Sequence, residues 1–198
     1  MRVLQNIIIL VIIIMINGCK STKIENLLDA PHTWRKEVLE FPLIFARSLP
    51  YKGEEHIRFA EGWGDVNDED YFSYVFIWIL EDDPDLTVLR VTSDMDTYFT
   101  GLMKTGLLTK LKFFKKLPKT KVSFYRSQGL NSMFEGKIEV YDAFFKREKI
   151  VLNAKINSSY CSVLKRYIIY FRLSPKEFHE PIWEDLQAVK IKYDCGGT

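Results

Sequence analysis

The feature that most constrains this fold is the segment YFSYVFIWIL, residues 71–80, in which almost every side chain is apolar. Successive side chains of a β-strand point to opposite faces of the sheet, so Phe76 and Trp78 lie on one face and Ile77 and Ile79 on the other. Both faces are therefore apolar. A strand that is apolar on both faces is expected at the centre of its sheet.

Other segments show the alternation of half-buried strands, at residues 122–125, 134–141, 150–156 and 167–172. A short strand is also expected around Ile57 and Phe59, and short polar connections such as residues 146–149 suit hairpins. Runs of strands with separate helices predict an α+β fold. We expect a single antiparallel sheet of about five to seven strands, packed against one or two helices.

Helical spacing predicts a first helix with an apolar stripe at Met95, Tyr98, Phe99, Leu102 and Met103. We expect Ser93 or Asp94 to cap its start and Gly106 to end it. The sequence SPKE, residues 174–177, has the pattern of a capping box, with Ser174 as the cap. It predicts a second, short helix close to the C-terminus.

The first residues of the chain have the layout of an export signal. Arg2 precedes an unbroken apolar run at residues 7–16. A helix needs about 20 apolar residues to cross a bilayer, so this run is too short to span one. A positive start, a short apolar core and small residues after it are typical of a secretory signal peptide.

The end of this apolar run, Ile16-Asn17-Gly18-Cys19, resembles the lipobox of bacterial lipoproteins, although Asn17 replaces the usual Ala or Ser. The resemblance implies cleavage before Cys19, a diacylglycerol on its sulfur and an acyl chain such as palmitate on its amine. Two or three chains anchor a protein stably to a membrane. Lys20 resembles the pattern for outer-membrane delivery. The alternative is an ordinary signal peptide, or an uncleaved helix, in which Cys19 has no role.

These patterns divide the chain into a signal peptide at residues 1–18, a tether at residues 19–30 and one α+β domain at residues 31–198. A mature chain of this length is enough for one domain with a full core. Residues 26–42 are expected to form one or two helical turns.

Two further cysteines, Cys161 and Cys195, form an even pair in a chain that is expected to be exported. We predict a disulfide between them that attaches the C-terminal tail to a strand. The alternative is two unpaired thiols. No C-x-x-C spacing is present, so the sequence does not support a thiolate zinc site or redox chemistry.

Charge is distributed unevenly along a chain whose formal net charge is only +2. This balance argues against a dedicated nucleic-acid binder. Eight basic residues and no acidic residue lie between Asp96 and Glu135. Lys112, Lys115 and Lys116 are candidate binding residues that could contact anionic lipid headgroups near the anchoring membrane. The alternatives are an acidic partner or a solvated surface.

The aromatic face that contains Trp78 is a second candidate binding surface. Aromatic side chains combine a large apolar area with a polar group, so this face can line a lipid or glycan pocket. The alternative is an ordinary core. The acidic segment GDVNDED, residues 64–70, lacks the central Gly and the distal Glu of a calcium loop, and we expect a solvated loop there.

The sequence does not predict a catalytic site. If one exists, His56 and Glu55 are the best of several weak candidates for catalytic residues. A carboxylate beside an imidazole can tune it for acid–base chemistry. The alternative for His56 is an exposed position on an edge strand. The three histidines of the chain lack the spacing of paired metal ligands, so neither a metal site nor a cofactor is expected.

Two classes of function follow from these features. We favour a membrane-anchored envelope lipoprotein with a non-catalytic binding or accessory domain. Its target would be an envelope protein, lipid or glycan, and its location the cell envelope, at the outer membrane if the envelope has one. The alternative is an envelope hydrolase with a dispersed acid–base site around His56. Of the two classes, the sequence favours the non-catalytic protein over the enzyme.

Overall fold

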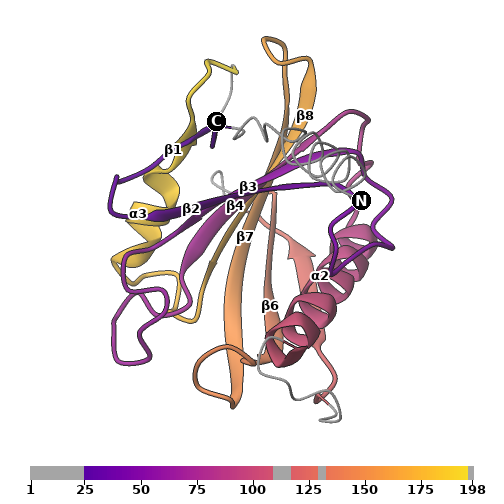
Figure 1. Cartoon of the computed structure of the whole chain (residues 1–198). Helices are drawn as coiled ribbons and strands as arrows, with labels where there is room; N and C mark the ends of the chain where they lie inside the picture. Colours follow the sequence, from indigo (N-terminus) through magenta and orange to yellow (C-terminus); the bar gives the residue numbers. More distant parts are fainter. Residues whose placement is uncertain (1–24, 109–116, 129–132, 196–198) are drawn as a thin grey trace, which may run out of the picture.

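The computed structural model describes residues 25–108, 117–128 and 133–195 (Figure 1). These residues form an α+β fold with an antiparallel seven-stranded sheet. Its strands, in spatial order, are β2 (Arg35–Glu40), β3 (Gly53–Phe59), β4 (Tyr74–Leu80), β8 (Arg166–Ser174), β7 (Lys149–Cys161), β6 (Phe134–Tyr141) and β5 (Lys121–Arg126). A second sheet pairs β1 (Leu28–Asp29) with β9 (Lys190–Ile191), and the two described helices are α2 (Val88–Leu108) and α3 (Ile182–Ala188).

The central strand predicted from residues 71–80 is β4, which lies between β3 and β8 and has every side chain buried. Its two faces belong to different cores. Phe76 and Trp78 face a core that α2 helps to form, whereas Ile77 and Ile79 face a core that contains residues of α3. Burial on both faces explains why this strand carries almost no polar side chain.

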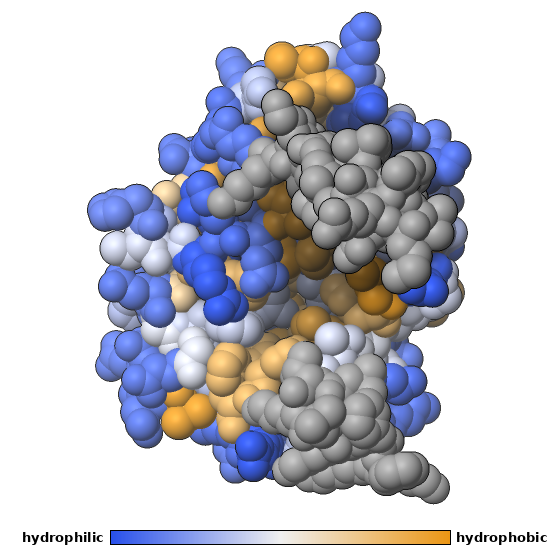
Figure 2. Space-filling view, viewed as in Figure 1, coloured by the Kyte–Doolittle hydropathy of each residue, from blue (hydrophilic) through white to orange (hydrophobic). Residues whose placement is uncertain are grey.

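The sheet therefore separates two layers. Figure 1 shows α2 and α3 on opposite sides of it, α2 packed on β5 and β6 and α3 on β8. On the face seen in Figure 2, hydrophilic residues cover most of the periphery and apolar residues gather around a central hollow. Neither of the described helices is long and apolar enough to cross a membrane.

The predicted disulfide is present. The Cys161 and Cys195 sulfurs are 2.09 Å apart and join residues that are 34 positions apart in the sequence. Cys161 is the last residue of β7, and Cys195 follows β9. The C-terminal tail is thus attached to a strand of the large sheet, as the cysteine count predicted.

The predicted start and end of the first helix were wrong. The helix α2 begins at Val88, and the Thr87 hydroxyl accepts a hydrogen bond from the Arg90 amide at 3.1 Å. Thr87 therefore caps the helix, rather than Ser93 or Asp94. Gly106 lies inside the helix, where a Cβ would come within 3.0 Å of side chains of Ala143 and Phe144. That glycine allows close packing and does not end the helix.

The predicted capping box was also wrong. Ser174 is the last residue of β8, its hydroxyl is 2.8 Å from the Ser73 hydroxyl, and it accepts a hydrogen bond from the Lys176 amide at 3.1 Å. The C-terminal helix α3 begins only at Ile182. Ser174 therefore forms hydrogen bonds at the end of a strand and does not cap the start of a helix.

The helical turns expected at residues 26–42 are absent from that segment, which contains the strands β1 and β2 instead. β2 pairs in register with β3, and β1 pairs with β9, so that Leu28 lies opposite Ile191. The expectation of a single sheet was therefore incomplete. The small second sheet adds to the layer that contains α3, because Leu28 and Ile191 are buried in the same core as Trp183.

Candidate functional site

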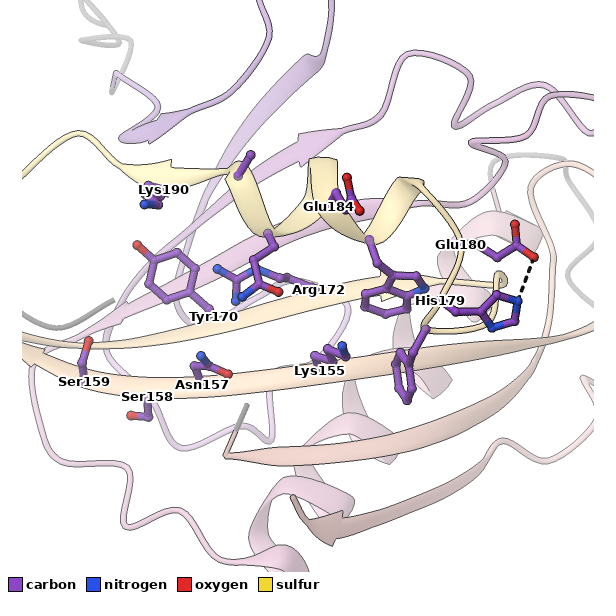
Figure 3. A pocket seen from close by; sticks show the side chains of 14 residues that line it. Lys155, Asn157, Ser158, Ser159, Tyr170, Arg172, His179, Glu180, Glu184 and Lys190 are labelled. Atoms are coloured by element: carbon purple, nitrogen blue, oxygen red, sulfur yellow. Dashed lines mark ion pairs between the residues drawn. The ribbon is translucent and has the colours of Figure 1, made fainter. Parts of the chain in front are cut away.

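A groove lies where the layer that contains α3 stops partway across the large sheet. The core beneath this layer draws its residues of the large sheet from β4 and β8, and its only residue from β7 is Cys161. The exposed part of β7 therefore forms one side of an open groove of about 770 Å³ beside α3 (Figure 3). Its lining is mainly polar or charged and includes side chains from β7, β8, α3 and β9.

Two cations form the floor of this groove. Lys155 on β7 and Arg172 on β8 are direct partners in the antiparallel register, so their side chains share a face of the sheet. Figure 3 shows both side chains between the strands and α3. Within the described part of the chain, neither side chain has a carboxylate within ion-pair distance.

Arg172 is only 7% exposed. Its Nε donates a hydrogen bond to the Leu186 carbonyl near the end of α3 at 3.0 Å, and its guanidinium carbon lies 4.9 Å from the Tyr170 ring centre. Burial lowers the pKa of this arginine. The side chain is thus held in one place without a neutralising acid.

The aromatic rings in the wall of the groove are held by a hydrogen bond and by contacts with each other. The Trp183 indole donates a hydrogen bond to the Lys176 carbonyl at 3.0 Å, and its ring meets the Phe178 ring edge to face at 4.8 Å. The Lys155 ammonium lies 4.7 Å from the Phe178 ring centre and 5.5 Å from that of Trp183. These distances are in the range of cation–π contacts, which position the ammonium group.

The rim carries charges of both signs. His179 and Glu180 form an ion pair at 3.6 Å on the loop before α3, shown by the dashed line in Figure 3. Glu184 lies in the first turn of α3, and Lys190 belongs to β9. Because the lining is mostly polar, the groove suits a polar ligand better than an acyl chain.

The catalytic candidates His56 and Glu55 point to opposite faces of the sheet, as neighbours on a strand must. Glu55 points into the core beneath α2, where it is 0% exposed and accepts a hydrogen bond from the Tyr98 hydroxyl at 2.6 Å. Burial raises the pKa of Glu55 to about 8. These two residues therefore do not form an acid–base pair.

His56 is also completely buried, which overturns the expectation of an exposed edge-strand position. Its Nδ1 accepts a hydrogen bond from the Leu27 amide at 3.1 Å, so its Nε2 carries the hydrogen and donates a hydrogen bond to the Glu54 carboxylate at 2.8 Å. Burial lowers its pKa. The imidazole links the segment before β1 to β3, and an acid–base site for the alternative hydrolase is not accessible there.

Trp78 is 0% exposed and packs against aromatic rings, including Phe171 at 4.7 Å and Tyr51 at 5.3 Å between ring centres. Its face of β4 is filled by protein, as in the core alternative. The other predicted binding residues, Lys112, Lys115 and Lys116, and the lipidation site Cys19 lie outside the described residues. Their roles stay predictions.

Neither Arg172 nor Lys155 was among the binding residues predicted from the sequence. A signal was present for Arg172, because its charge follows the buried residues Ile168 and Tyr170 on the same face of the strand. Lys155 gave no such signal, because it occupies a polar position in the regular alternation of β7. Their proximity was not visible, because it depends on the register between β7 and β8. Among the described residues, no group of three or more His, Cys, Asp or Glu side chains is arranged to hold a metal ion.

Comparison with known proteins adds no relative. No protein-family model matches the chain, and neither the curated proteins nor the solved structures give a match. Function must therefore be inferred from the residues of this chain and their geometry.

Proposed function

We propose that this protein is a membrane-anchored envelope lipoprotein whose domain binds a polar envelope component in the groove between α3 and the strands β7 and β8. The observation that carries the proposal is the groove itself, an open volume of about 770 Å³ with a mainly polar lining. The domain needs no catalytic residue for this role. It acts by recognition and by retention at the membrane.

The anchor is proposed from the resemblance of residues 16–19 to a lipobox. The disulfide between Cys161 and Cys195 supports an oxidising compartment, such as a bacterial envelope, because such bonds persist there. A tethered domain meets its target at a raised local concentration, so a modest affinity is sufficient.

The lining of the groove supports a polar target over the hydrophobic ligand that the aromatic face of β4 suggested. Side-chain amides and hydroxyls, at Asn157, Ser159 and Gln187, border the groove beside its charges. Such groups bind sugars, peptides or headgroups through hydrogen bonds. The target is therefore expected among the polar molecules or exposed polar groups of the envelope.

Lipidation at Cys19 is tested on the full chain isolated from its native envelope. We expect mass spectrometry to find Cys19 as the first residue, carrying a diacylglycerol and an acyl chain. A Cys19→Ala variant should lose incorporation of labelled palmitate, whereas Ser21→Ala should keep it. A native protein that begins at Met1 with an unmodified sulfur would contradict the anchor.

Recognition in the groove is tested by blocking it. Gln187 lies in the lining and Asp185 does not, although both are exposed on α3. Native mass spectrometry of the full chain in detergent should find a bound envelope compound in the wild type and in Asp185→Trp, but not in Gln187→Trp. Retention of the compound by Gln187→Trp would place its binding elsewhere.

A further inference from the structure

We propose that Arg172 and Lys155 form an oxyanion subsite in the groove, which binds a carboxylate or phosphate group carried by the ligand. The inference rests on the groove of the proposed function, but it requires neither the lipid anchor nor a particular envelope component. The two cations would define which chemical group a ligand of this groove must carry.

The cross-strand position of the two cations is the first argument. Lys155 and Arg172 are direct register partners, and like charges directly opposite each other in an antiparallel pair repel. Among the described residues, no carboxylate oxygen lies within 4 Å of the charged nitrogens of either side chain to relieve this repulsion, and Glu180 is paired with His179 instead. An oxyanion between the two cations would neutralise both.

The orientation of Arg172 is the second argument. Its Nε is occupied by the Leu186 carbonyl, and neither terminal nitrogen donates to an acceptor in the described part of the chain. These two nitrogens form the planar fork that binds carboxylate and phosphate groups with two parallel hydrogen bonds. A buried cation is normally paired, so a fork that opens on the groove favours an anionic ligand there.

The Lys155 ammonium group is already positioned before a ligand binds. It is held against the Phe178 and Trp183 rings. A group that is already positioned loses little freedom when a ligand binds, which favours affinity. Asn157, Ser159 and Gln187 lie in the same groove and can hydrogen-bond the polar remainder of the ligand.

A purely structural role would explain less of this arrangement. Arg172 stabilises the end of α3 through the Leu186 carbonyl, because cations favour the carbonyl end of a helix. That role uses one of its five N–H donors and does not involve Lys155. It therefore leaves the second cation and the unused fork without a function.

The test uses the full chain in detergent and two probes, sodium phosphate and sodium glucuronate, with sodium chloride at equal ionic strength as the reference. Binding stabilises the native state by an amount that depends on the ratio of probe concentration to Kd. We expect at least one probe to raise the unfolding temperature above the chloride reference, and calorimetric titration to give a single site. Phosphate alone would identify a phosphate ligand, and glucuronate alone a carboxylate ligand.

Matched variants locate the site. Lys155→Gln should weaken probe binding at least fivefold, whereas Lys149→Gln, the same change on the exposed start of β7, should alter it less than twofold. Arg172→Lys keeps the charge but removes the fork, and it should also weaken binding at least fivefold. Lys155→Gln keeps the test decisive if the Arg172 variant does not fold.

Two results would overturn the subsite. One is a wild-type chain that phosphate and glucuronate stabilise no more than chloride does. The other is an equal loss of probe binding in Lys155→Gln and Lys149→Gln, which would indicate non-specific attraction to positive charge. Neither result depends on whether Cys19 carries a lipid, so the anchor and the subsite can fail separately.

Discussion

Glu55 is a single carboxyl group placed inside an apolar core. It is fully buried, lies directly opposite Trp78 in the pairing of β3 with β4, and accepts a hydrogen bond from Tyr98 on α2. Burial raises its pKa from 4.5 to about 8, so the group is mainly protonated at pH 7. A neutral carboxylic acid is thus part of the contact between α2 and the sheet.

This protonation makes stability depend on pH. The pKa of Glu55 in the folded protein lies above its unfolded value, so protonated Glu55 contributes fully to stability below about pH 4.5. This contribution is lost as the pH rises through 8. Glu55→Gln keeps an acceptor for Tyr98 and cannot ionise. We expect it to raise the free energy of unfolding by about 3 kcal/mol at pH 7 and to flatten its fall between pH 5 and 8.

Chemical denaturation at several pH values measures this effect. Glu40→Gln, on the exposed edge strand β2, is the control and should follow the wild-type pH dependence. If Glu55→Gln and the wild type lost stability in parallel between pH 5 and 8, Glu55 would not be protonated in the folded protein.

Among the elements, α2 shows how packing overrides local preference. Gly101 lies inside this helix, where alanine normally stabilises by about 1 kcal/mol relative to glycine. A Cβ at this position would lie 1.8 Å from the backbone carbonyl oxygen of Phe45. The glycine is therefore needed for the close approach of the segment around Phe45 to α2, and helix propensity alone predicts the wrong sign.

Gly101→Ala is expected to lower the free energy of unfolding by about 2 kcal/mol, because the backbone segment must move away from the helix. Lys104→Ala, in the same helix at an exposed position, should change it by less than about 0.5 kcal/mol. Urea titration of both variants provides the measurement. A Gly101→Ala variant with a higher free energy of unfolding would show that the segment around Phe45 can move away from α2 without loss of stability.

Local sequence patterns predicted several elements well. The strands β5, β6 and β8 match the expected segments closely, because alternation of side chains is a property of each strand by itself. The strand β7 was also predicted, but it continues beyond the expected end at Ile156 to Cys161. The start of α2 was misplaced, since Thr87 precedes the first residue of the predicted apolar stripe, Met95, by two turns of helix. The strand β1 was missed because its partner, β9, is distant in the sequence.

At the scale of the whole molecule, the disulfide ties the α3 layer to the large sheet. It joins the end of β7 to the tail after β9, and both elements border the groove. Loop-closure entropy for residues 34 positions apart corresponds to about 4 kcal/mol of stabilisation. The bond therefore supports the wall of the proposed binding site as well as the fold.

Removal of both cysteines, as Cys161→Ala with Cys195→Ala, is expected to lower the free energy of unfolding by about 3–4 kcal/mol. Hydrogen exchange followed by mass spectrometry should show faster exchange in α3 and β9, with a smaller change in α2 on the other side of the sheet. Equal acceleration in α2 and α3 would contradict a local role for the bond. Two alkylatable thiols in the native protein would refute it.

The sequence by itself determined the strand character of most segments, the two buried faces of β4 and the pairing of the two cysteines. These features depend on side-chain alternation along one strand or on the number of thiols. Only the tertiary structure decided that Arg172 lies opposite Lys155, that His56 is buried and that the α3 layer leaves a groove. Such placements depend on the register and packing of segments far apart in the chain, and no local pattern encodes them.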